Sequence, residues 1–481
     1  MFYVNVCIIH RELEEEIGEM DETTSETEME VCEGSEADQD QNPPDISILL
    51  ERILSIHVIK KKIFDFLSPQ DVKNGVLVSR KWKELLEVSS LWKWAVVRLQ
   101  TNQLPHIEVL LQSQRFRLIE KVQFRLDNPS EGATLSSQHL SEIRNHIELF
   151  ANFVLQNFLD LELKILEIDL RIKQSNLILS NTLFDAACHL VEVHFSHRGC
   201  QRGDKSVFEM SPAFFEQLSN ATDIRLQRLR FSGISLYNVN AEDIGASVCR
   251  LKEVDLSNTD LNPTQLRNIF NRLSSSSNQN LTKLDLSYSN LSIIKPSQLA
   301  KVVSGLRWWD WVSCHLTSQQ LAAIVTEIAD SPHLTLTSVS FYQNLAEVEK
   351  DILARAVVRL ENVKFFDNRF TEDQLDELLK AIVKTERLSL KSLEFSHCNL
   401  DLSSEELLAR AVCRLQSVDL VVSSVTKAHS NAIFRQIIQA DALNLRNLTL
   451  DDDLILDDEL EKESSKKLRS YHGARFKTYN L

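Results

Sequence analysis

Apolar residues recur in the second half of the chain in a pattern that alternates short strands with helices. Segments beginning at residues 251, 281, 306, 336, 360, 390, 415 and 445 carry apolar residues at positions 1, 4 and 6, as in LTKLDLSYSNL (281–291). This spacing predicts strands whose positions 4 and 6 face a core and whose positions 3, 5 and 7 face solvent. Between them, LTSQQLAAIVTEIA (316–329) has helical spacing that places Gln320 on the exposed face of its helix. The starts are separated alternately by about 30 and 25 residues, so a double unit repeats every 54 or 55 residues.

These segments resemble leucine-rich repeats, because each matches LxxLxLxx(N/C)xL with conservative swaps. The long-short alternation with full helices is similar to the ribonuclease-inhibitor-like subclass. The resemblance implies an α/β horseshoe over residues 251–460, with parallel strands on the concave wall and helices on the convex wall. Cys314 and Cys398 occupy the position where asparagine is usual, and we interpret them as buried structural thiols.

The residues on either side of the regular array are less regular. FRLIEKVQFRL (116–126), LELKILEIDLRI (161–172), HLVEVHFSHRGC (189–200) and ATDIRLQRLRF (221–231) each read as a strand. We interpret residues 101–250 as degenerate repeats that lead into the regular ones. Residues 461–481 form a basic C-terminal tail, and the sequence leaves open whether the tail folds back on the array.

Residues 63–92 pack two helix signals and a turn into a short stretch. An apolar cluster that includes Ile63, Phe64 and Leu67 ends at Ser68, because Pro69 cannot extend a helix. Ser68 then suits the N-cap of a second helix, which has Pro69 at its first position. Further apolar residues continue at helical spacing or just beyond it: Val72, Val78, Trp82, Leu91 and Trp92. This small helical unit has more large apolar groups than it can bury, so they either dock a partner or pack on the neighbouring domain.

The same stretch resembles an F-box, the helical module that docks substrate receptors onto the Skp adaptor of cullin-type ubiquitin ligases. The matching elements are Ile63-Phe64 with Leu67, Pro69-x-Asp71-Val72, Val78-Ser79-Arg80-x-Trp82 and Leu91-Trp92. The resemblance implies a helical domain over residues 46–100 whose adaptor-binding residues are Ile63, Phe64, Leu67, Pro69, Val72, Val78, Trp82, Leu91 and Trp92. One element departs from the pattern: no proline stands in Leu54-Ser55-Ile56, where the family opens with Leu-Pro.

Charge and composition narrow the classes of function. Of the net charge of −16, residues 1–45 contribute −14, from fifteen acids and one arginine, so we expect a disordered acidic tail there. The nearly neutral remainder gives no case for nucleic-acid binding. The sequence has no apolar run of about 18 residues, so we expect no membrane span. No nucleotide motif is present, and the eight cysteines form no CxxC pair, so we expect neither cofactor nor metal and favour a reducing compartment, cytoplasmic or nuclear.

Catalytic patterns are scarce. Asp255, Asp285 and Asp310 fall at position 5 of successive strands and could pair for acid–base chemistry, but a solvated acidic strip is the simpler interpretation of a Leu-Asp-Leu repeat. We therefore expect a non-enzymatic protein of one of two classes. The first is the substrate receptor of a Skp–cullin–F-box ubiquitin ligase, and the second is a repeat scaffold or inhibitor capped by N-terminal helices.

A substrate site is predicted on the concave wall around Trp308. Trp309 and Trp311 take the inward positions of LRWWDWVSCHL (306–316), whereas Trp308 takes position 3 and faces solvent. The predicted substrate-binding residues are Trp308, Val312, Tyr342, Phe366 and Asp310. Aromatic anchors in a polar rim are the usual composition of binding hot spots. The alternative is that Trp308 packs under the C-terminal tail or a loop.

Overall fold

The computed structural model describes residues 96–101, 104, 107–112, 116–117, 119–127, 136–171, 180–197, 208–209, 211–276, 280–342, 345–421, 423–440, 443–451, 458–472 and 475–479. All of them belong to one compact unit, Lys60–Leu481. The predicted acidic tail lies outside the described residues, and so does the predicted helical domain except for residues 96–100, which form a strand.

One parallel sheet runs through this unit. Its fourteen described strands pair in chain order, and two further strands, β5 and β7, form a separate two-stranded sheet. The strands are β1 Val96–Gln100, β2 Lys121–Asp127, β3 Ile165–Arg171, β4 Glu192–His197, β5 Phe208–Glu209, β6 Arg228–Ser232, β7 Ile234–Ser235, β8 Glu253–Asp255, β9 Lys283–Asp285, β10 Trp308–Asp310, β11 Ser338–Phe341, β12 Asn362–Phe366, β13 Ser392–Ser396, β14 Ser417–Asp419, β15 Asn447–Asp451 and β16 Arg475–Tyr479. The sequence prediction of a parallel α/β array is confirmed.

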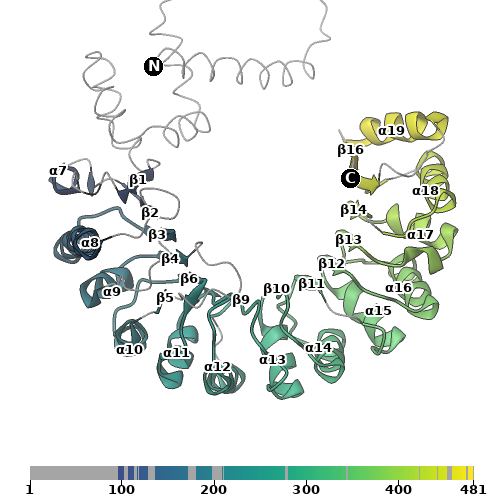
Figure 1. Ribbon diagram of the computed structural model, residues 1–481. Helices are drawn as coiled ribbons and strands as arrows, with labels where there is room; N and C mark the ends of the chain where they lie inside the picture. The colour runs from purple at the N-terminus through teal and green to yellow at the C-terminus, as the bar shows by residue number, and fades with distance from the viewer. Residues whose placement is uncertain are drawn as a thin grey trace, which may run out of the picture. The chain divides into compact units, whose positions relative to one another are not determined.

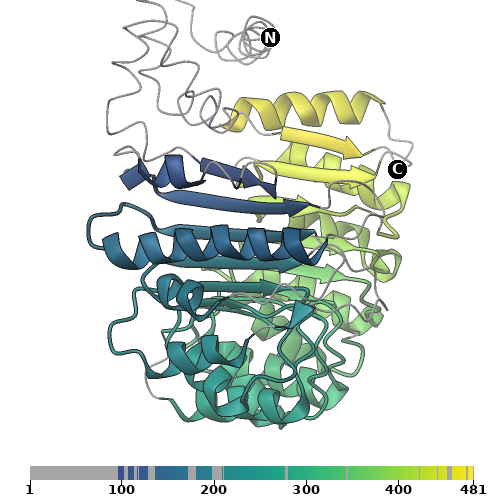
Figure 2. The same cartoon turned by 60° about the vertical axis from the view of Figure 1, so that its left-hand side comes forward.

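Helices cover the outer face of the sheet (Figures 1 and 2). They are α7 Ile107–Leu111, α8 Ser137–Asn157, α9 Asn181–Cys188, α10 Pro212–Asn220, α11 Ala241–Val248, α12 Pro263–Ser275, α13 Pro296–Gly305, α14 Ser318–Asp330, α15 Lys350–Arg359, α16 Glu372–Lys384, the 3-10 helix η3 Leu400–Leu402, α17 Glu405–Val412, α18 Lys427–Gln439 and α19 Asp458–His472. A helix is about 10 Å wide while strands are spaced about 4.8 Å apart. The sheet therefore lies on the inner, concave side, as Figure 1 shows.

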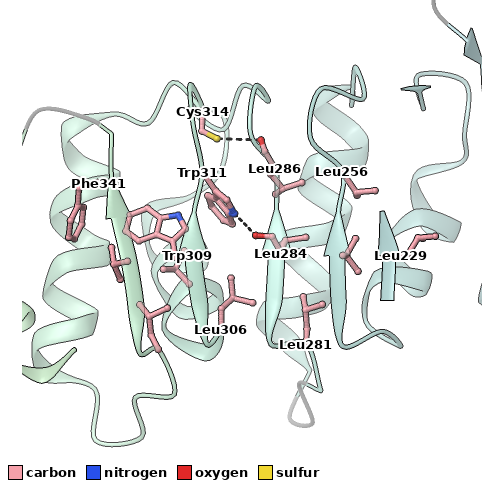
Figure 3. Packing of buried hydrophobic residues seen from close by; sticks show 14 of the residues in the cluster. Leu229, Leu256, Leu281, Leu284, Leu286, Leu306, Trp309, Trp311, Cys314 and Phe341 are labelled. Atoms are coloured by element: carbon pink, nitrogen blue, oxygen red, sulfur yellow. Dashed lines mark hydrogen bonds between the residues drawn. The ribbon is translucent and has the colours of Figure 1, made fainter. Parts of the chain in front are cut away.

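The core lies between the sheet and the helices. Positions 1, 4 and 6 of every regular repeat are buried, including Leu306, Trp309 and Trp311 of the β10 repeat. Figure 3 shows Trp309 and Trp311 beside Leu284, Leu286 and Phe341 in this layer. The four strands predicted in the irregular part also form, as β2, β3, β4 and β6. The predicted inward positions are thus confirmed.

Position 9 of several repeats ties a strand to the one before it. The thiols of Cys314 and Cys398 are buried, and each hydrogen-bonds the backbone carbonyl at position 6 of the preceding strand, Leu286 and Phe365 respectively. The bond from Cys314 is drawn in Figure 3. Asn368 donates in the same way to the Phe341 carbonyl at 2.8 Å. The interpretation of the two cysteines as structural thiols is confirmed.

A second ladder links alternate helices through buried polar side chains. Gln320 donates from Nε2 to the carbonyls of Leu291 and Ile294 at 2.8 and 2.7 Å, while its Oε1 accepts from the Thr317 amide at 2.8 Å. It is 1% exposed, so its predicted exposed position was wrong. The residues at this position are Gln265, Gln320, Gln374 and His429, each closing a capping box at the start of its helix. Each bonds the loop before the preceding helix, so the ladder joins two helices into one double unit.

Basic side chains join one double unit to the next. Arg359 ends α15, and Arg250 and Arg414 stand two residues after the ends of α11 and α17; each donates to backbone carbonyls at the end of the preceding helix. Lys467, inside α19, donates likewise to a carbonyl near the end of α18. These carbonyls have no partner within their own helix, so the cations satisfy them and complement the helix dipole. Gly305 occupies the corresponding place at the end of α13.

The joint between α12 and α13 is therefore built differently. Lys301 donates to the carbonyl of Ser274, and Gln298 donates to the Asn271 side chain at 2.8 Å. These contacts are exposed at the surface. A flexible ammonium here replaces the planar guanidinium fork that Arg250, Arg359 and Arg414 supply at their joints.

The C-terminal residues extend the array. Residues 461–481 were predicted as a basic tail, and the described part of that range contributes most of α19 and all of β16. β16 pairs in parallel with β15, and Leu468 of α19 is buried in the core. The charge pattern concealed this last unit, because its helix has only a few apolar residues among many charged ones.

Candidate functional site

Side chains on the concave face form rows that cross the strands. The register pairs Asp310 with Ser340, and Ser340 with Lys364, so these residues share a row at position 5. Because side chains alternate along a strand, the next residues on the same face are at position 7. Val312, Tyr342 and Phe366 therefore lie side by side at the carboxyl ends of their strands.

Two rings of the position 7 row form an aromatic cluster with His397, which follows at position 8 of the β13 repeat. The rings of Tyr342 and Phe366 have centroids 5.6 Å apart, and those of Phe366 and His397 are 5.2 Å apart at an interplanar angle of 69°. Phe366 is 42% exposed, and His397 is also exposed. We call Val312, Tyr342, Phe366 and His397 the aromatic row. Three of its four members were predicted from the sequence.

Asp310 supports this row from position 5. Its carboxylate hydrogen-bonds the Tyr342 hydroxyl. Burial, together with the charge and hydrogen bond of Asp310, raises the Tyr342 pKa to about 12, so the phenol stays neutral at physiological pH. The structure thus brings together Asp310, Tyr342 and Phe366 as a continuous polar and aromatic surface.

The acids on the neighbouring strands have a different local role. Asp255 and Asp285 each accept a hydrogen bond from the backbone amide two residues later, at 3.0 and 2.9 Å. Such turns are a common use of aspartate where a strand ends. At β10 the corresponding amide, that of Val312, donates instead to the Ser287 hydroxyl at 3.0 Å, which leaves the Asp310 carboxylate available to Tyr342.

We call Asp255, Asp285 and Asp310 the acidic column. Their three carboxylates make the centre of the concave face electronegative. Burial raises the pKa of Asp285 from its usual value, and the nearby charge of Asp255 acts in the same direction. The Ser287 hydrogen bonds oppose that rise. The column was predicted as a solvated acidic strip, and two of its members also fix the strand ends.

Trp308 lies apart from the aromatic row. It is 53% exposed at the start of β10, with Lys283 Nζ 6.0 Å from its ring centroid. Four residues of strand separate it from position 7, which is about 13 Å. The structure therefore places Trp308 on the predicted face but does not bring it into contact with Val312, Tyr342 or Phe366.

The pattern analysis missed two aromatic residues, His397 and Tyr288. Both follow their strands at position 8 with positive φ, 56° and 68°. Gly233 has φ 71° at the same position of the β6 repeat, so this backbone turn belongs to the repeat. A bulky residue in this conformation is uncommon. Tyr288 is 47% exposed, and its amide donates to the Val312 carbonyl, which places it next to the row. The signal available in the sequence was that both His397 and Tyr288 follow a strand, at the position that Gly233 takes in the β6 repeat.

A cavity of about 660 Å³ lies at the opposite edge of the sheet. It is lined by residues just before β3, β4, β6, β8 and β9, including Lys164, Arg225, Arg250 and Lys252. Arg250 already caps the end of α10, and Lys164 pairs with Glu120 at 2.7 Å. The cavity is thus lined largely by groups that hold the fold.

Within the described residues, no cluster of three or more His, Cys, Asp or Glu side chains is arranged to hold a metal ion. No described helix has the length and apolar character needed to cross a membrane. The predicted adaptor-binding residues, Ile63, Phe64, Leu67, Pro69, Val72, Val78, Trp82, Leu91 and Trp92, lie outside the described residues. No protein-family model matches the chain, and no curated protein has a significantly similar sequence.

Proposed function

We propose that this chain is the substrate-recognition subunit of a Skp–cullin–F-box type ubiquitin ligase. Residues 46–100 would bind the Skp adaptor, and the leucine-rich-repeat array would bind a protein substrate on its concave face. The observation that carries the proposal is the run of F-box-like elements in residues 63–92, directly before a parallel repeat array.

The concave surface supports the receptor role. An exposed ring such as Phe366, beside the half-buried Tyr342 and a carboxylate, has the composition of a protein-binding hot spot. A receptor needs no chemistry of its own, because a partner enzyme transfers ubiquitin. It acts by raising the effective concentration of the substrate near that enzyme. The proposed location is the cytoplasm or the nucleus, where such ligases work.

Adaptor binding tests the proposal directly. The full chain is mixed with purified Skp adaptor, and the dissociation constant is measured by calorimetry. The double variant Leu67→Ala, Pro69→Ala should weaken binding at least about tenfold, because it removes an apolar anchor and the helix-start proline. Gln70→Ala and Lys81→Ala are matched controls within the same motif, at positions where the F-box pattern accepts any residue, and both should bind like the wild type.

The outcome also separates the two classes of protein. Absence of adaptor binding by the wild-type chain would contradict the ligase proposal and favour a repeat scaffold or inhibitor. Equal binding by the double variant and the controls would mean that this motif is not the docking element. Circular dichroism of each variant shows that loss of binding is not loss of folding.

A further inference from the structure

Three neighbouring carboxylates of the concave face form no close ion pair with another described residue. Asp255, Asp285 and Asp310 occupy position 5 of β8, β9 and β10, on strands spaced about 4.8 Å apart. None of the ion pairs that join described residues involves them. Within the described residues, the more distant charges of Lys283 and Lys364 act on Asp285 and Asp310, but no ion pair neutralises the column.

Three other acids of the same face form ion pairs on either side of the column. Glu167 pairs with Lys121 at 2.6 Å, and Glu192 with Arg228 at 2.8 Å, on the strands before it. On the strands after it, Lys364 pairs with Glu394 at 2.7 Å. The carboxylates of the column differ from these three acids in forming no ion pair with a described residue. Burial disfavours that charge at Asp285, so an added cation would relieve an electrostatic cost.

The aromatic row begins at Val312, in the same repeat that carries Asp310 at the end of the column. Asp310 touches both features, because it belongs to the column and hydrogen-bonds Tyr342. Positions 5 and 7 of one strand are about 7 Å apart, within reach of one long side chain. Aromatic rings beside carboxylates suit arginine, whose guanidinium stacks on rings and pairs with carboxylates in a planar fork.

We propose that the acidic column and the aromatic row bind an extended protein segment that carries arginine beside apolar residues. The row and the neighbouring Tyr288 together extend from the β9 repeat to His397 on the β13 repeat. Five adjacent strands span about 19 Å, which an extended segment of about six residues covers. Apolar side chains would contact Val312 and Phe366, and arginines would reach Asp310 and Asp285. This deepens the proposed function by giving a class of substrate, and its biological meaning rests on that function.

A labelled peptide of alternating leucine and arginine, seven residues long, is the probe. Fluorescence anisotropy measures its affinity for the full chain in the absence of any adaptor. A counterpart with glutamate in place of arginine should not bind, and one with lysine should bind more weakly, because lysine lacks the planar fork. Binding of the arginine peptide should weaken as salt is added.

Variants locate the binding surface. Asp310→Asn removes a charge while keeping an acceptor for the Tyr342 hydroxyl, and it should weaken binding by about tenfold. Phe366→Ala should weaken it by a similar factor. The matched controls are Asp330→Asn, an exposed acid on α14, and Leu402→Ala, an exposed apolar residue on η3. Both should leave the affinity unchanged, and thermal melts check that every variant folds.

Two results would overturn this proposal. One is equal affinity for the arginine and glutamate peptides, or no binding of either. The other is binding that Asp310→Asn and Phe366→Ala leave unchanged, which would place an adventitious basic peptide on the acidic residues 1–45. Absence of adaptor binding would contradict the ligase proposal but would leave peptide binding unchanged. A failure of the proposed function can therefore be distinguished from a failure of the proposed peptide site.

Discussion

Replacing Gln320 by alanine should destabilise the array far more than its polar character suggests. The side chain makes three hydrogen bonds in a buried setting, to the Leu291 and Ile294 carbonyls and from the Thr317 amide, at 2.7 to 2.8 Å. A buried hydrogen bond contributes about 1 kcal/mol net, so their loss costs about 3 kcal/mol. Alanine regains a few tenths of a kcal/mol in helix propensity.

Gln319 provides a matched control on the same helix. It is exposed, and Gln319→Ala changes the same residue type with the same gain in helix propensity. Surface substitutions of this kind stay within about 0.5 kcal/mol. The difference between the two variants therefore isolates the three buried hydrogen bonds.

The assay is urea-induced unfolding of the full chain, followed by far-ultraviolet circular dichroism. Repeat arrays can unfold in more than one step, so hydrogen exchange of the amides in α13 and α14 shows where stability is lost. We expect Gln320→Ala to lower the free energy of unfolding of this region by about 3 kcal/mol. Equal stabilities of the Gln320 and Gln319 variants would refute the view that the buried amides hold each double unit together.

Two further predictions concern the core and the joints between double units. Burial raises the pKa of Cys314 to about 12 and that of Cys398 to about 11, so alkylation at mildly alkaline pH should label both only after unfolding; mass spectrometry showing rapid labelling of the native chain would contradict their burial. Arg359→Ala should lower the free energy of unfolding by about 2 kcal/mol, because it removes bonds to two carbonyls at the end of α14, whereas Arg355→Ala removes only an exposed ion pair and should cost under about 1 kcal/mol; similar urea midpoints for both would argue against the helix-capping role.

The fold was largely predictable because burial of large apolar side chains leaves a period in the sequence. Leucines such as Leu281, Leu284 and Leu286 fix which face of each strand is buried, and they did so across all eight regular repeats. Gln320 was misplaced because an amide in a first helical turn resembles an exposed residue. Its recurrence at 265, 320 and 374, three residues after Asn or Thr, was the overlooked signal of a capping box.

The candidate site was predictable in part for a related reason. The position of a residue within its repeat predicts that Tyr342 and Phe366 lie in one row, because side chains alternate strictly along a strand. That position alone did not show that Trp308 stands too far along its strand to contact the row. Nor does it give the turn that brings His397 against Phe366, since the left-handed residue after the strand is free of the alternation. Nor does it show that the Val312 amide donates to Ser287 while Tyr342 bonds Asp310, because each of these contacts joins residues of different repeats.

Gly305 stands at the end of α13, whereas the corresponding position at or just after the end of α11, α15 and α17 holds a helix-capping arginine. This difference has a mechanical consequence. At the joints capped by arginine, a helix end is clamped by a planar fork, whereas the α12–α13 joint relies on Lys301 and surface amides. Under load or mild denaturant, this joint should yield before its clamped neighbours. The aromatic row, from β10 to the β13 repeat, lies wholly on its C-terminal side. Under the receptor function proposed above, a compliant joint would let a substrate held by that row move relative to the N-terminal half of the array, and more of its lysines would come within reach of the transferring enzyme.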